Sequence, residues 1–316
     1  MLNVIRRLKS ANVLGINRRN AQYILQYNAR SLYPVVDNKV RTKQLAMAMG
    51  IPVPEQYGII EYEHQIRNLH KQLEPYPDFV IKPARGSGGN GIVVITDRPK
   101  QLYRKINGQL LNRHDLQHHV SNILTGMYSL GGQPDQALLE YHVHSDPVFQ
   151  PVIYRGVPDI RIVVFLGVPV MAMVRLPTRQ SEGKANLHQG AIGAGIDIVT
   201  GTTLDAVWKN KILSKQPDTG FPVAGIQIPH WDTILRTSTR CYEMSGLGYQ
   251  GVDFVLDRDK GALMLELNAR PGLNIQIANQ AGLHNRLKLV ERHQQSLKSI
   301  DNRVAFARRH FSTNLN

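Results

Sequence analysis

The stretch GVDFVLDRDKGALMLELNARPG, residues Gly251 to Gly272, decides the fold of this chain. Two runs of apolar and β-favouring residues flank the segment Arg258-Asp259-Lys260-Gly261, in which Asp and Gly favour a turn. The stretch therefore predicts a β-hairpin with a four-residue loop. The predicted pairs across that loop are Asp257 with Ala262, Leu256 with Leu263, Phe254 with Leu265 and Asp253 with Glu266. One face of this hairpin is apolar and can enter a core, whereas the other face is acidic.

The acidic face predicts a cation site. Directly opposed side chains lie roughly 4.5–5.5 Å apart at Cβ, so Asp253 and Glu266 would repel each other unless a cation lay between them. Asn268 follows two residues later on the same face. Carboxylate and amide oxygens are hard ligands that suit Mg²⁺ better than Zn²⁺. The alternative is an exposed hairpin edge whose acids only favour solubility.

The composition is typical of a folded intracellular protein with anionic partners. The chain has 316 residues, 42% of them apolar, and a formal net charge of +14. That charge suits nucleotide phosphates, acidic substrates, nucleic acid or a membrane surface, without choosing among them. The single cysteine, Cys241, excludes an internal disulfide framework and fits a reducing compartment. No apolar run has the length of a signal peptide or a membrane span, so we expect a cytoplasmic protein without a membrane partner.

The periodicity predicts alternating helices and strands. A basic helical arm is expected over residues 1–36, in which the arginines of Ile16 to Asn20 would lie on a solvated face. A helix should end at Gly50, since the following Ile51-Pro52-Val53-Pro54 must be extended. The other expected helices cover residues 61–73, 100–128 and 275–316, and the other expected strands cover residues 79–82, 92–96, 137–143, 159–166 and 169–176.

A glycine-rich loop joins the strands predicted at 79–82 and 92–96. Gly86, Gly88 and Gly91 match the G-x-G-x-x-G pattern, but a dinucleotide fingerprint requires a helix next, and the Ile92-Val93-Val94-Ile95 run is β-branched. A flap between two strands remains, whose backbone N–H groups could close over phosphates. Lys82, on the strand before it, could supply a point charge. The alternative is an ordinary flexible hairpin.

These residues resemble the ATP-grasp superfamily, and more closely its alpha-L-glutamate ligase-related branch, which includes ribosomal-protein glutamate ligase-like and sugar-transfer-associated members. The resemblance covers about residues 36 to 275. Four motifs appear in the family's order: Asn38-Lys39-Val40-Arg41-Thr42-Lys43, Val80-Ile81-Lys82-Pro83 with its glycine flap, Leu138-Leu139-Glu140-Tyr141, and Asp253 with Glu266-Leu267-Asn268. The resemblance implies an α+β ATP-grasp fold in which two α+β lobes hold ATP between them.

The resemblance also implies roles for individual residues at the nucleotide. Lys39 and Lys82 would hold its phosphates, Glu140 would meet the adenine edge, and Asp146 would take the ribose. The backbone of Tyr141 and Val143 would read the base. The flap residues implied to close over the phosphates are Gly86, Ser87, Gly88, Gly89, Asn90 and Gly91. Asp253, Glu266 and Asn268 would carry two Mg²⁺ ions, which Mn²⁺ could replace.

A second group of residues is implied to contact the other substrate. Arg161 and Arg175 lie on the two predicted strands after residue 158, and Arg179 follows shortly after. Asn186-Leu187-His188-Gln189-Gly190 resembles the Asn-Leu-His-x-Gly loop of glutamate-adding ligases, where arginines steady an acyl phosphate and the loop frames the acceptor. Arg161, Arg175 and Arg270 are therefore candidate catalytic residues, and Arg179, Asn186 and His188 are candidate substrate-binding residues. The alternatives are salt bridges for the arginines and an exposed loop for His188.

Two departures from the family pattern stand out. Only 38 residues precede Lys39, so the resemblance implies a short N-terminal helical arm in place of the usual N-terminal α/β domain. Related D-alanine ligases carry an arginine two residues before the metal aspartate, where this chain has Gly251, so Arg161 or Arg270 would have to supply that charge. The expected domains are a basic arm at 1–36, an N-terminal lobe at 37–136, a C-terminal lobe with the metal site at 137–295 and a basic tail at 296–316.

The function expected from these features is an ATP-dependent carboxylate–amine ligase. A substrate carboxylate would attack the γ-phosphate of Mg-ATP, and an amine would then displace phosphate from the acyl phosphate. The expected substrate is a small molecule or peptide with a carboxylate and an amine, such as glutamate. The alternatives are an ATP-grasp phosphoryl transferase and a basic nucleic-acid-binding protein, although nucleic acid is not the expected partner because no aromatic stacking motif or recognition helix is present. The oligomeric state stays open, a homodimer included.

Overall fold

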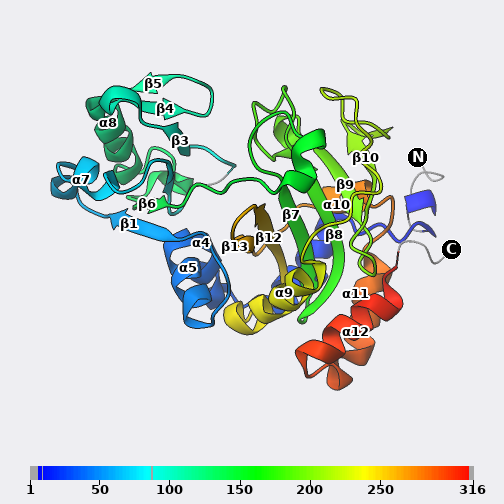
Figure 1. The fold of residues 1–316 in the computed structure, drawn as a ribbon. Helices are drawn as coiled ribbons and strands as arrows, with labels where there is room; N and C mark the ends of the chain where they lie inside the picture. The colour runs from blue at the N-terminus through cyan, green and yellow to red at the C-terminus, as the bar shows by residue number, and fades with distance from the viewer. Residues whose placement is uncertain (1–5, 9, 87, 313–316) are drawn as a thin grey trace. The chain divides into compact units, whose positions relative to one another are not determined.

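The structure is a computed structural model that describes residues 6–8, 10–86 and 88–312. The chain forms two compact units. The smaller unit comprises residues 37–44 and 53–143, and the larger unit comprises residues 1–36, 45–52 and 144–316. Figure 1 labels their helices and strands. Among the described residues, no helix combines the length and the apolar character that crossing a bilayer requires.

The smaller unit is built on a six-stranded antiparallel sheet in the order β1-β6-β2-β3-β4-β5. Its strands are β1 (Gln56–Ile60), β2 (Phe79–Pro83), β3 (Val93–Asp97), β4 (Tyr103–Lys105), β5 (Leu110–Leu111) and β6 (Ala137–Glu140). Its helices are α6 (Glu63–Ile66), α7 (Leu69–Leu73) and α8 (Arg113–Leu124), with 3₁₀ turns at Pro99–Gln101 and Leu130–Gly132. Helix α5 (Lys39–Ala48) begins in this unit.

The two faces of this sheet carry different chemistry. Phe79 and Ile81 of β2 are buried in an apolar cluster with Val120 of α8. Since side chains alternate along a strand, Lys82 points to the opposite face. Leu138 of β6 pairs directly with Lys82, so it lies on that same face, and it packs against Val40 of α5. The sheet therefore has one apolar face and one face on which charged side chains are covered by α5.

The larger unit is built on a seven-stranded antiparallel sheet in the order β11-β10-β9-β8-β7-β12-β13. Its strands are β7 (Asp159–Phe165), β8 (Val168–Leu176), β9 (Ile192–Ile196), β10 (Thr203–Trp208), β11 (Lys211–Leu213), β12 (Tyr249–Asp257) and β13 (Gly261–Asn268). Helices α9 (Trp231–Ser245) and α12 (Ile300–His310) pack on each other and on β8, and α10 (Asn274–Ala278) packs on β8, β9 and β10. Other helical segments of the described residues include α2 (Ile16–Arg18), a π-helix at Arg19–Ile24, α3 (Leu25–Tyr27), α4 (Tyr33–Asp37), α11 (His284–His293) and 3₁₀ turns at Arg30–Leu32, Pro147–Val152, Leu187–Gln189 and Gln294–Ser296.

The decisive stretch forms the predicted hairpin, β12–β13, but with a different register near its loop. Asp253 pairs with Glu266 as predicted. Asp257, however, pairs with Gly261, so the loop has three residues and Gly261 takes a left-handed φ of +72°. The predicted pairing of Asp257 with Ala262 is wrong by one residue. A bulge beside Asp253 absorbs the difference, because Phe254 pairs with Met264 and leaves Leu265 as the extra residue.

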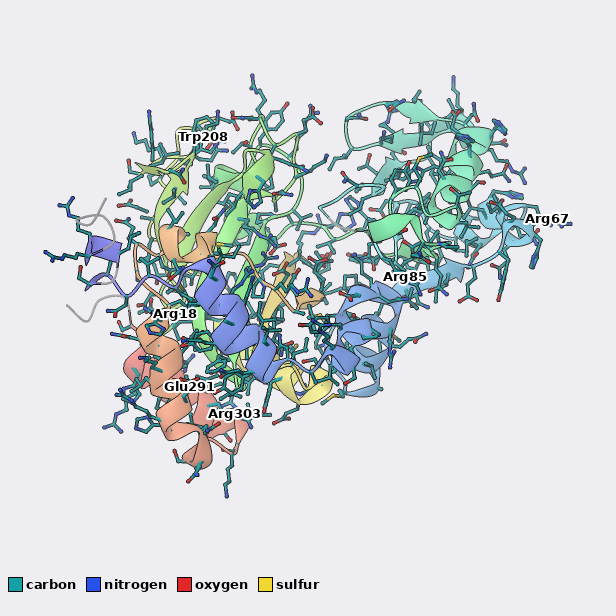
Figure 2. The ribbon with its side chains drawn as sticks, turned by 180° about the vertical axis from the view of Figure 1, so that it is seen from behind. Arg18, Arg67, Arg85, Trp208, Glu291 and Arg303 are labelled. Atoms are coloured by element: carbon teal, nitrogen blue, oxygen red, sulfur yellow. The ribbon has the colours of Figure 1, made fainter. Side chains whose placement is uncertain are left out.

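The N-terminal arm is part of the larger unit's core. It is helical from Ile16 to Tyr27 through α2, the π-helix and α3, and Tyr23 packs edge-on against Phe165 of β7. Arg19 is buried and its Nη1 donates to the carbonyl oxygen of Pro271 at 2.9 Å. The expectation that these arginines lie on a solvated face is therefore wrong for Arg19. Figure 2 shows the arm crossing the larger unit beside α11, where the Tyr27 hydroxyl donates to Glu291 at 2.8 Å.

Asn28 directly follows α3 and hydrogen-bonds the arm to the sheet. Its Nδ2 donates to the carbonyl oxygens of Tyr249 at 2.7 Å and Ala269 at 3.1 Å, and its Oδ1 accepts the N–H of Tyr249 at 2.9 Å. Tyr249 begins β12 and Ala269 directly follows β13. The buried side-chain amide of Asn28 therefore bonds both to the first residue of β12 and to the residue that follows β13.

Two other expectations differ from the structure. The helix expected over residues 100–128 is confined to α8, because β4 and β5 form a hairpin before it. The boundary expected at 136/137 falls instead after Val143, since β6 is a central strand of the smaller unit's sheet. The helix expected near the end of the chain is present as α12, whose Val304 and Ala307 are buried. In the first case, strand pairing overrode local helix preference.

Replacing Asn28 with Ala should destabilise the larger unit. Buried N–H and carbonyl groups of Tyr249 and Ala269 would lose their partners, which predicts a loss of about 2–3 kcal/mol in the free energy of unfolding. Urea denaturation would measure this loss. Asn17→Ala, at an exposed asparagine of the same arm, is the matched control and should change stability little. Equal stability of the two variants would contradict the bridging role of Asn28.

Candidate functional site

The smaller unit contains a buried carboxylate held by two lysines. Glu140, on β6, is fully buried, and its Oε1 pairs with Lys82 of β2 while its Oε2 pairs with Lys43 of α5. The ammonium of Lys43 also donates to the carbonyl oxygen of Pro54 at 2.6 Å. The three side chains carry a net charge of +1, located on the sheet face that α5 covers.

The protonation of this triad follows from burial and pairing. Burial lowers the pKa of Lys43 to about 8, although Glu140 opposes the shift, and the nearby charge of Lys82 adds to it. Burial alone would raise the pKa of Glu140, but Lys82 and Lys43 outweigh it and lower that pKa. Glu140 is therefore an anion, and Lys43 loses its proton more easily than an ordinary lysine does.

The local sequence explains how α5 places Lys39 and Lys43. Asn38 caps the helix, since its Oδ1 accepts the N–H groups of Val40 at 2.9 Å and Arg41 at 3.1 Å. Lys39 and Lys43 are four residues apart and so lie on the same helix face. Lys39 reaches the glycine loop, because its Nζ donates to the carbonyl oxygen of Gly86 at 2.5 Å. The sequence analysis assigned Lys39 but missed Lys43, which the four-residue spacing could have identified.

The glycine loop lies between two strands, as predicted. Strands β2 and β3 pair with Phe79 opposite Ile95, which excludes the helix that a dinucleotide fingerprint needs. Gly88 and Gly89 have left-handed φ values of +65° and +79°, and a Cβ added to either would meet no atom within 4 Å. Their conformation therefore requires glycine, although space for a side chain is present. Ser87 lies outside the described residues.

The residues expected to bind the nucleoside fall in different parts of the fold. Glu140 pairs each carboxylate oxygen with a lysine, and its expected contact with the adenine edge stays a prediction. Tyr141 donates its N–H to the carbonyl oxygen of Glu55 at 2.9 Å, and Val143 ends the smaller unit. Asp146 belongs to the larger unit, where its Oδ1 accepts the N–H of Val148 at 2.8 Å.

The larger unit carries a second buried carboxylate held by two cations. Asp253 on β12 pairs across the sheet with Glu266 on one side and with Arg161 of β7 on the other. Arg175 of β8 pairs with Asp159, two residues from Arg161 along β7. Because directly paired residues project from the same face, these five side chains form one charged surface in the middle of the sheet.

The contacts on this surface are close and charge-assisted. Arg161 binds Asp253 in a bidentate manner, from Nε to Oδ1 at 2.7 Å and from Nη2 to Oδ2 at 2.5 Å. Arg175 Nη2 donates to the same Oδ2 at 2.8 Å and also to Asp159 Oδ2. Three carboxylates, those of Asp159, Asp253 and Glu266, face two guanidinium groups, so the surface has a net charge of −1 before any ligand binds.

Burial and pairing separate the two aspartates. Burial alone would raise the pKa of Asp253, but Arg161 and Arg175 lower it to about 2. Burial raises the pKa of Asp159 to about 6 despite its pairing with Arg175, and the charge of Asp253 adds to that rise. Asp253 is therefore a permanent anion, whereas Asp159 is the group that could take up a proton. The sequence analysis did not assign Asp159.

The donor set at the end of the hairpin fits a hard cation. Asn268 Nδ2 lies 3.2 Å from Asp253 Oδ2 and 3.3 Å from Glu266 Oε1, so the amide and both carboxylates converge on one point. Amide nitrogen and oxygen are assigned from the hydrogen-bond network, and a flipped amide would direct its oxygen to the same point. Among the described residues, Asp159 Oδ1 and Arg175 Nε are buried without a hydrogen-bond partner. These atoms suit a cation or water and an anion, respectively.

The other predicted site residues of the larger unit lie apart from this surface. Arg179 is exposed, with its guanidinium over the ring of Tyr154 at 5.2 Å. Arg270 is exposed and lies over the ring of Tyr33 at 5.2 Å, so Arg161 is the arginine that supplies the charge beside Asp253. Asn186 caps the 3₁₀ turn Leu187–Gln189, and its Oδ1 accepts the N–H of His188, whose side chain is exposed.

One antiparallel unit carries a glycine flap and buried lysines, and the other carries a hairpin with two acids and an amide. Together these features define an ATP-grasp protein. The family model "Sugar-transfer associated ATP-grasp" matches residues 18–292. The chain therefore belongs to the sugar-transfer associated ATP-grasp family, as the sequence motifs predicted. A search of curated proteins finds no significant match.

Solved structures that match this chain are distant from it in sequence. The ATP-grasp ligase PsnB complexed with a minimal precursor has a TM-score of 0.46 at 14% identity, with 85% of this chain and 63% of that chain covered. The D-cycloserine synthetase DcsG has a TM-score of 0.46 at 14% identity, with 86% and 74% covered. The D-alanine–D-alanine ligase of Bacillus anthracis complexed with ATP has a TM-score of 0.48 at 11% identity, with 84% and 68% covered. This chain thus spans less than two thirds of PsnB.

Lys43 should make the stability of the protein depend on pH in the alkaline range. Its pKa is about 8 in the folded chain and 10.5 ordinarily, so between these values the unfolded chain holds a proton that the folded chain has released. The contribution of Lys43 to the free energy of unfolding should therefore rise as the pH increases from about 8 to 10.5.

Urea denaturation across this pH range would measure the rise, and Lys43→Met should remove it. Lys71→Met, at an exposed lysine of α7, should keep the pH dependence of the parent protein. A Lys43→Met variant whose stability follows the parent curve throughout would show that this lysine titrates normally.

Proposed function

We propose that the protein is an ATP-dependent carboxylate–amine ligase that forms an amide or peptide bond through an acyl phosphate. The observation that carries this proposal is the charged surface of the larger unit. Two buried guanidinium groups surround Asp253, Arg175 Nε is without a partner among the described residues, and Glu266 and Asn268 converge beside them. A surface with cations next to hard oxygen ligands suits a metal-bound phosphoryl group in transfer.

Each part of this surface has a role in the proposed reaction. Glu266, Asn268 and Asp253 would hold Mg²⁺, which supplies Lewis-acid charge neutralisation at the ATP phosphates; two ions are proposed, with Mn²⁺ as a substitute. Arg161 and Arg175 orient Asp253 and present N–H groups to the oxygens that gain charge as the carboxylate attacks the γ-phosphorus. ADP then leaves, and an amine displaces phosphate from the acyl phosphate to give the amide. Arg270 is proposed to join the catalytic arginines when ligands bind.

The smaller unit supplies the proposed nucleotide-binding groups. Lys82 and Lys39 would contact the phosphates beneath the glycine flap, where a Cβ on Gly88 or Gly89 would meet no atom within 4 Å. Glu140 holds Lys82 and Lys43 in place, so we assign adenine recognition to the backbone of Tyr141 and Val143 rather than to this carboxylate. Asp146 remains a proposed ribose ligand.

The proposed substrates are a carboxylic acid and an amine, with an amino acid or peptide such as glutamate on one side. Arg179 is exposed and its guanidinium lies on Tyr154 with Arg155 on the same ring, so it can form a bidentate contact with a carboxylate. Asn186 and His188, in the loop after it, are proposed to frame the acceptor. The family relation supports a ligase at this general level, and the glutamate-like substrate is our extension of it.

Trapping with hydroxylamine tests the reaction class. Incubation of the protein with Mg-ATP, hydroxylamine and single candidate acids should give an acyl hydroxamate with ADP and phosphate. A phosphorylated product that is stable to hydroxylamine would instead establish a phosphoryl transferase on the same fold. ADP formation that no acid stimulates, with no product of either kind, would overturn the ligase proposal.

Glu266→Gln should abolish turnover and leave the fold intact. The substitution removes the one carboxylate of the surface that no arginine contacts in the described structure, and with it the negative charge that would attract a metal ion. ADP release at saturating Mg²⁺ would measure the loss. Asp259→Asn, at an exposed acid in the loop of the same hairpin, is the control and should keep full activity. Parental turnover and Mg²⁺ dependence in the Glu266 variant would disprove the metal assignment.

Lys82→Met should weaken ATP binding selectively. Loss of one hydrogen bond to a charged phosphate predicts a decrease of roughly 1.5–3 kcal/mol in binding free energy, while adenosine affinity should hardly change. Glu140 would keep Lys43 as a partner, so no buried carboxylate is left unpaired. Calorimetry with both ligands measures the difference, and Lys71→Met is the control. An equal loss for ATP and adenosine would place the role of Lys82 in folding.

A further inference from the structure

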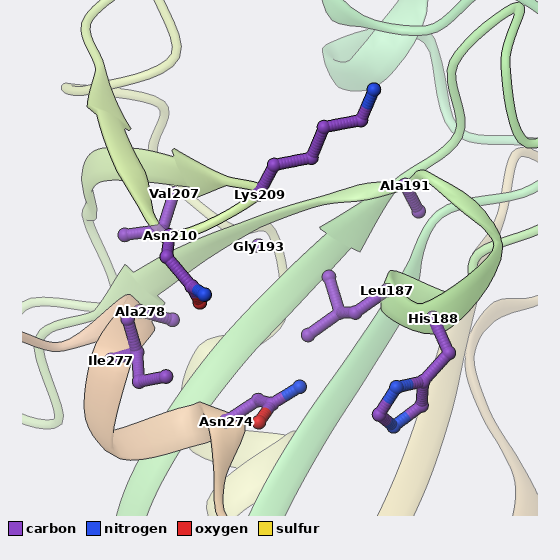
Figure 3. A pocket seen from close by; sticks show the side chains of 10 residues that line it. All are labelled: Leu187, His188, Ala191, Gly193, Val207, Lys209, Asn210, Asn274, Ile277 and Ala278. Carbon is purple, nitrogen blue, oxygen red and sulfur yellow. The ribbon is translucent and has the colours of Figure 1, made fainter.

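A pocket of about 170 Å³ lies on the larger unit at the edge of α10. Its apolar lining includes Leu187, Val207 and Ile277, and two amides, those of Asn210 and Asn274, face its interior (Figure 3). Ile277 is 44% exposed, which is unusual for a large aliphatic side chain on a helix that packs against a sheet. The pocket is therefore a partly open hollow that combines apolar side chains with two neutral amides and two basic residues, His188 and Lys209.

The pocket exists because residue 193 is a glycine. A Cβ added to Gly193 would lie 3.2 Å from Leu187 Cδ2 and 3.7 Å from Ala278 Cβ, two residues that also line the hollow. Gly193 is in β9 and its φ is not in the left-handed region, so its backbone does not require glycine. What the glycine provides is space, since a Cβ at this position would press on Leu187 at 3.2 Å and a larger side chain would enter the hollow.

The register of the sheet connects this hollow with the charged surface. Gly193 pairs directly with Arg175 on β8 and with Val207 on β10, so all three lie on the same sheet face. Neighbouring strands are roughly 4.8 Å apart, so the pocket begins one strand away from the catalytic arginine proposed above. A ligand seated in the hollow can extend its polar end along this row toward Arg175.

We propose that this pocket binds the aliphatic body of the carboxylic acid substrate, an acid with a branched or straight side chain of about three or four carbons. This inference rests on the proposed ligase function and specifies one of its two substrates. An apolar cavity of about 150 Å³ accepts a ligand the size of benzene, which sets the size of the group that this pocket can hold. Asn210 and Asn274 can satisfy a polar substituent without bringing charge into the hollow.

The lining does not suit an acidic side chain such as that of glutamate. The lining has two basic residues. The side chain of His188 is exposed, and the Nζ of Lys209 lies 4.6 Å from the ring centroid of Trp208, with its side chain directed away from the hollow (Figure 3). A carboxylate placed against Leu187 and Ile277 would lose hydration without gaining a partner. The anionic substrate discussed above therefore belongs at Arg179, which is not among the lining residues.

Calorimetry on the full-length protein without ATP tests the pocket by itself. The probes are 4-methylpentanoate and L-leucine, with L-glutamate as the comparator. We expect the two aliphatic acids to bind at least about tenfold more tightly than glutamate, and Gly193→Val and Ile277→Asp each to weaken them about tenfold or more. Ile106→Asp is the matched control, because Ile106 is an isoleucine of similar exposure, 38%, in the smaller unit. Since Ile277 is an exposed residue, its variant can be interpreted even where Gly193→Val fails to fold.

The outcomes separate this inference from the proposed function. Glutamate binding as tightly as the aliphatic acids, or aliphatic binding that both pocket variants leave unchanged, would overturn the pocket assignment. Acids that form hydroxamates but bind equally well to the parent protein, to Gly193→Val and to Ile277→Asp would support the ligase proposal. The same result would overturn the pocket assignment. If the pocket variants weaken the binding of aliphatic acids but no ATP-dependent product forms, the pocket assignment is supported. That result would contradict only the ligase proposal.

Discussion

The cost of burying Asp253 constrains the larger unit. A carboxylate loses several kcal/mol of hydration in a protein interior, and only well-placed cations and hydrogen bonds offset that loss. Asp253 is fully buried on a strand with partners on both sides, and it receives donors from Arg161, Arg175 and Asn268. The three donors come from three different strands. The charge therefore fixes how β7, β8, β12 and β13 align, because a slip of one residue would leave it unpaired.

The smaller unit also buries a carboxylate, but it offsets the loss of hydration with lysines. Glu140 is also held by two cations from different elements, but these are Lys43 and Lys82 rather than arginines. A guanidinium keeps its charge at any physiological pH, and its planar fork fixes the orientation of a carboxylate. An ammonium is a point charge that burial can deprotonate, as the lowered pKa of Lys43 indicates. One unit thus holds its anion rigidly, whereas the other holds it through a cation whose charge depends on its surroundings.

The sequence predicted the parts of this arrangement that depend on local pattern. The hairpin, the glycine flap between strands and the opposition of Asp253 and Glu266 follow from turn residues and alternation, and the structure contains all three. The registers near the loop could not be predicted, because a bulge changes the count without changing the composition. Lys43 was not assigned, although its spacing from Lys39 places both lysines on one helix face, and Asp159 was not assigned because its pairing with Arg175 depends on the register of β7 and β8. For Glu140, Arg179 and Arg270 the motif predicted a ligand contact, whereas the protein's own charged and aromatic groups occupy these side chains in the structure.

The attachment of the N-terminal arm has a consequence for the order in which the chain can fold during synthesis. Leu14 bonds to Gln276 across 262 residues, and Asn28 bonds to Tyr249 across 221. The arm is synthesised before the residues to which it bonds, so it cannot dock until the chain has been made as far as Gln276. The smaller unit, whose residues all lie between 37 and 143, needs no such wait. Contacts of this sequence separation slow folding, so for most of translation the apolar face of the arm, including Tyr23, has no native partner.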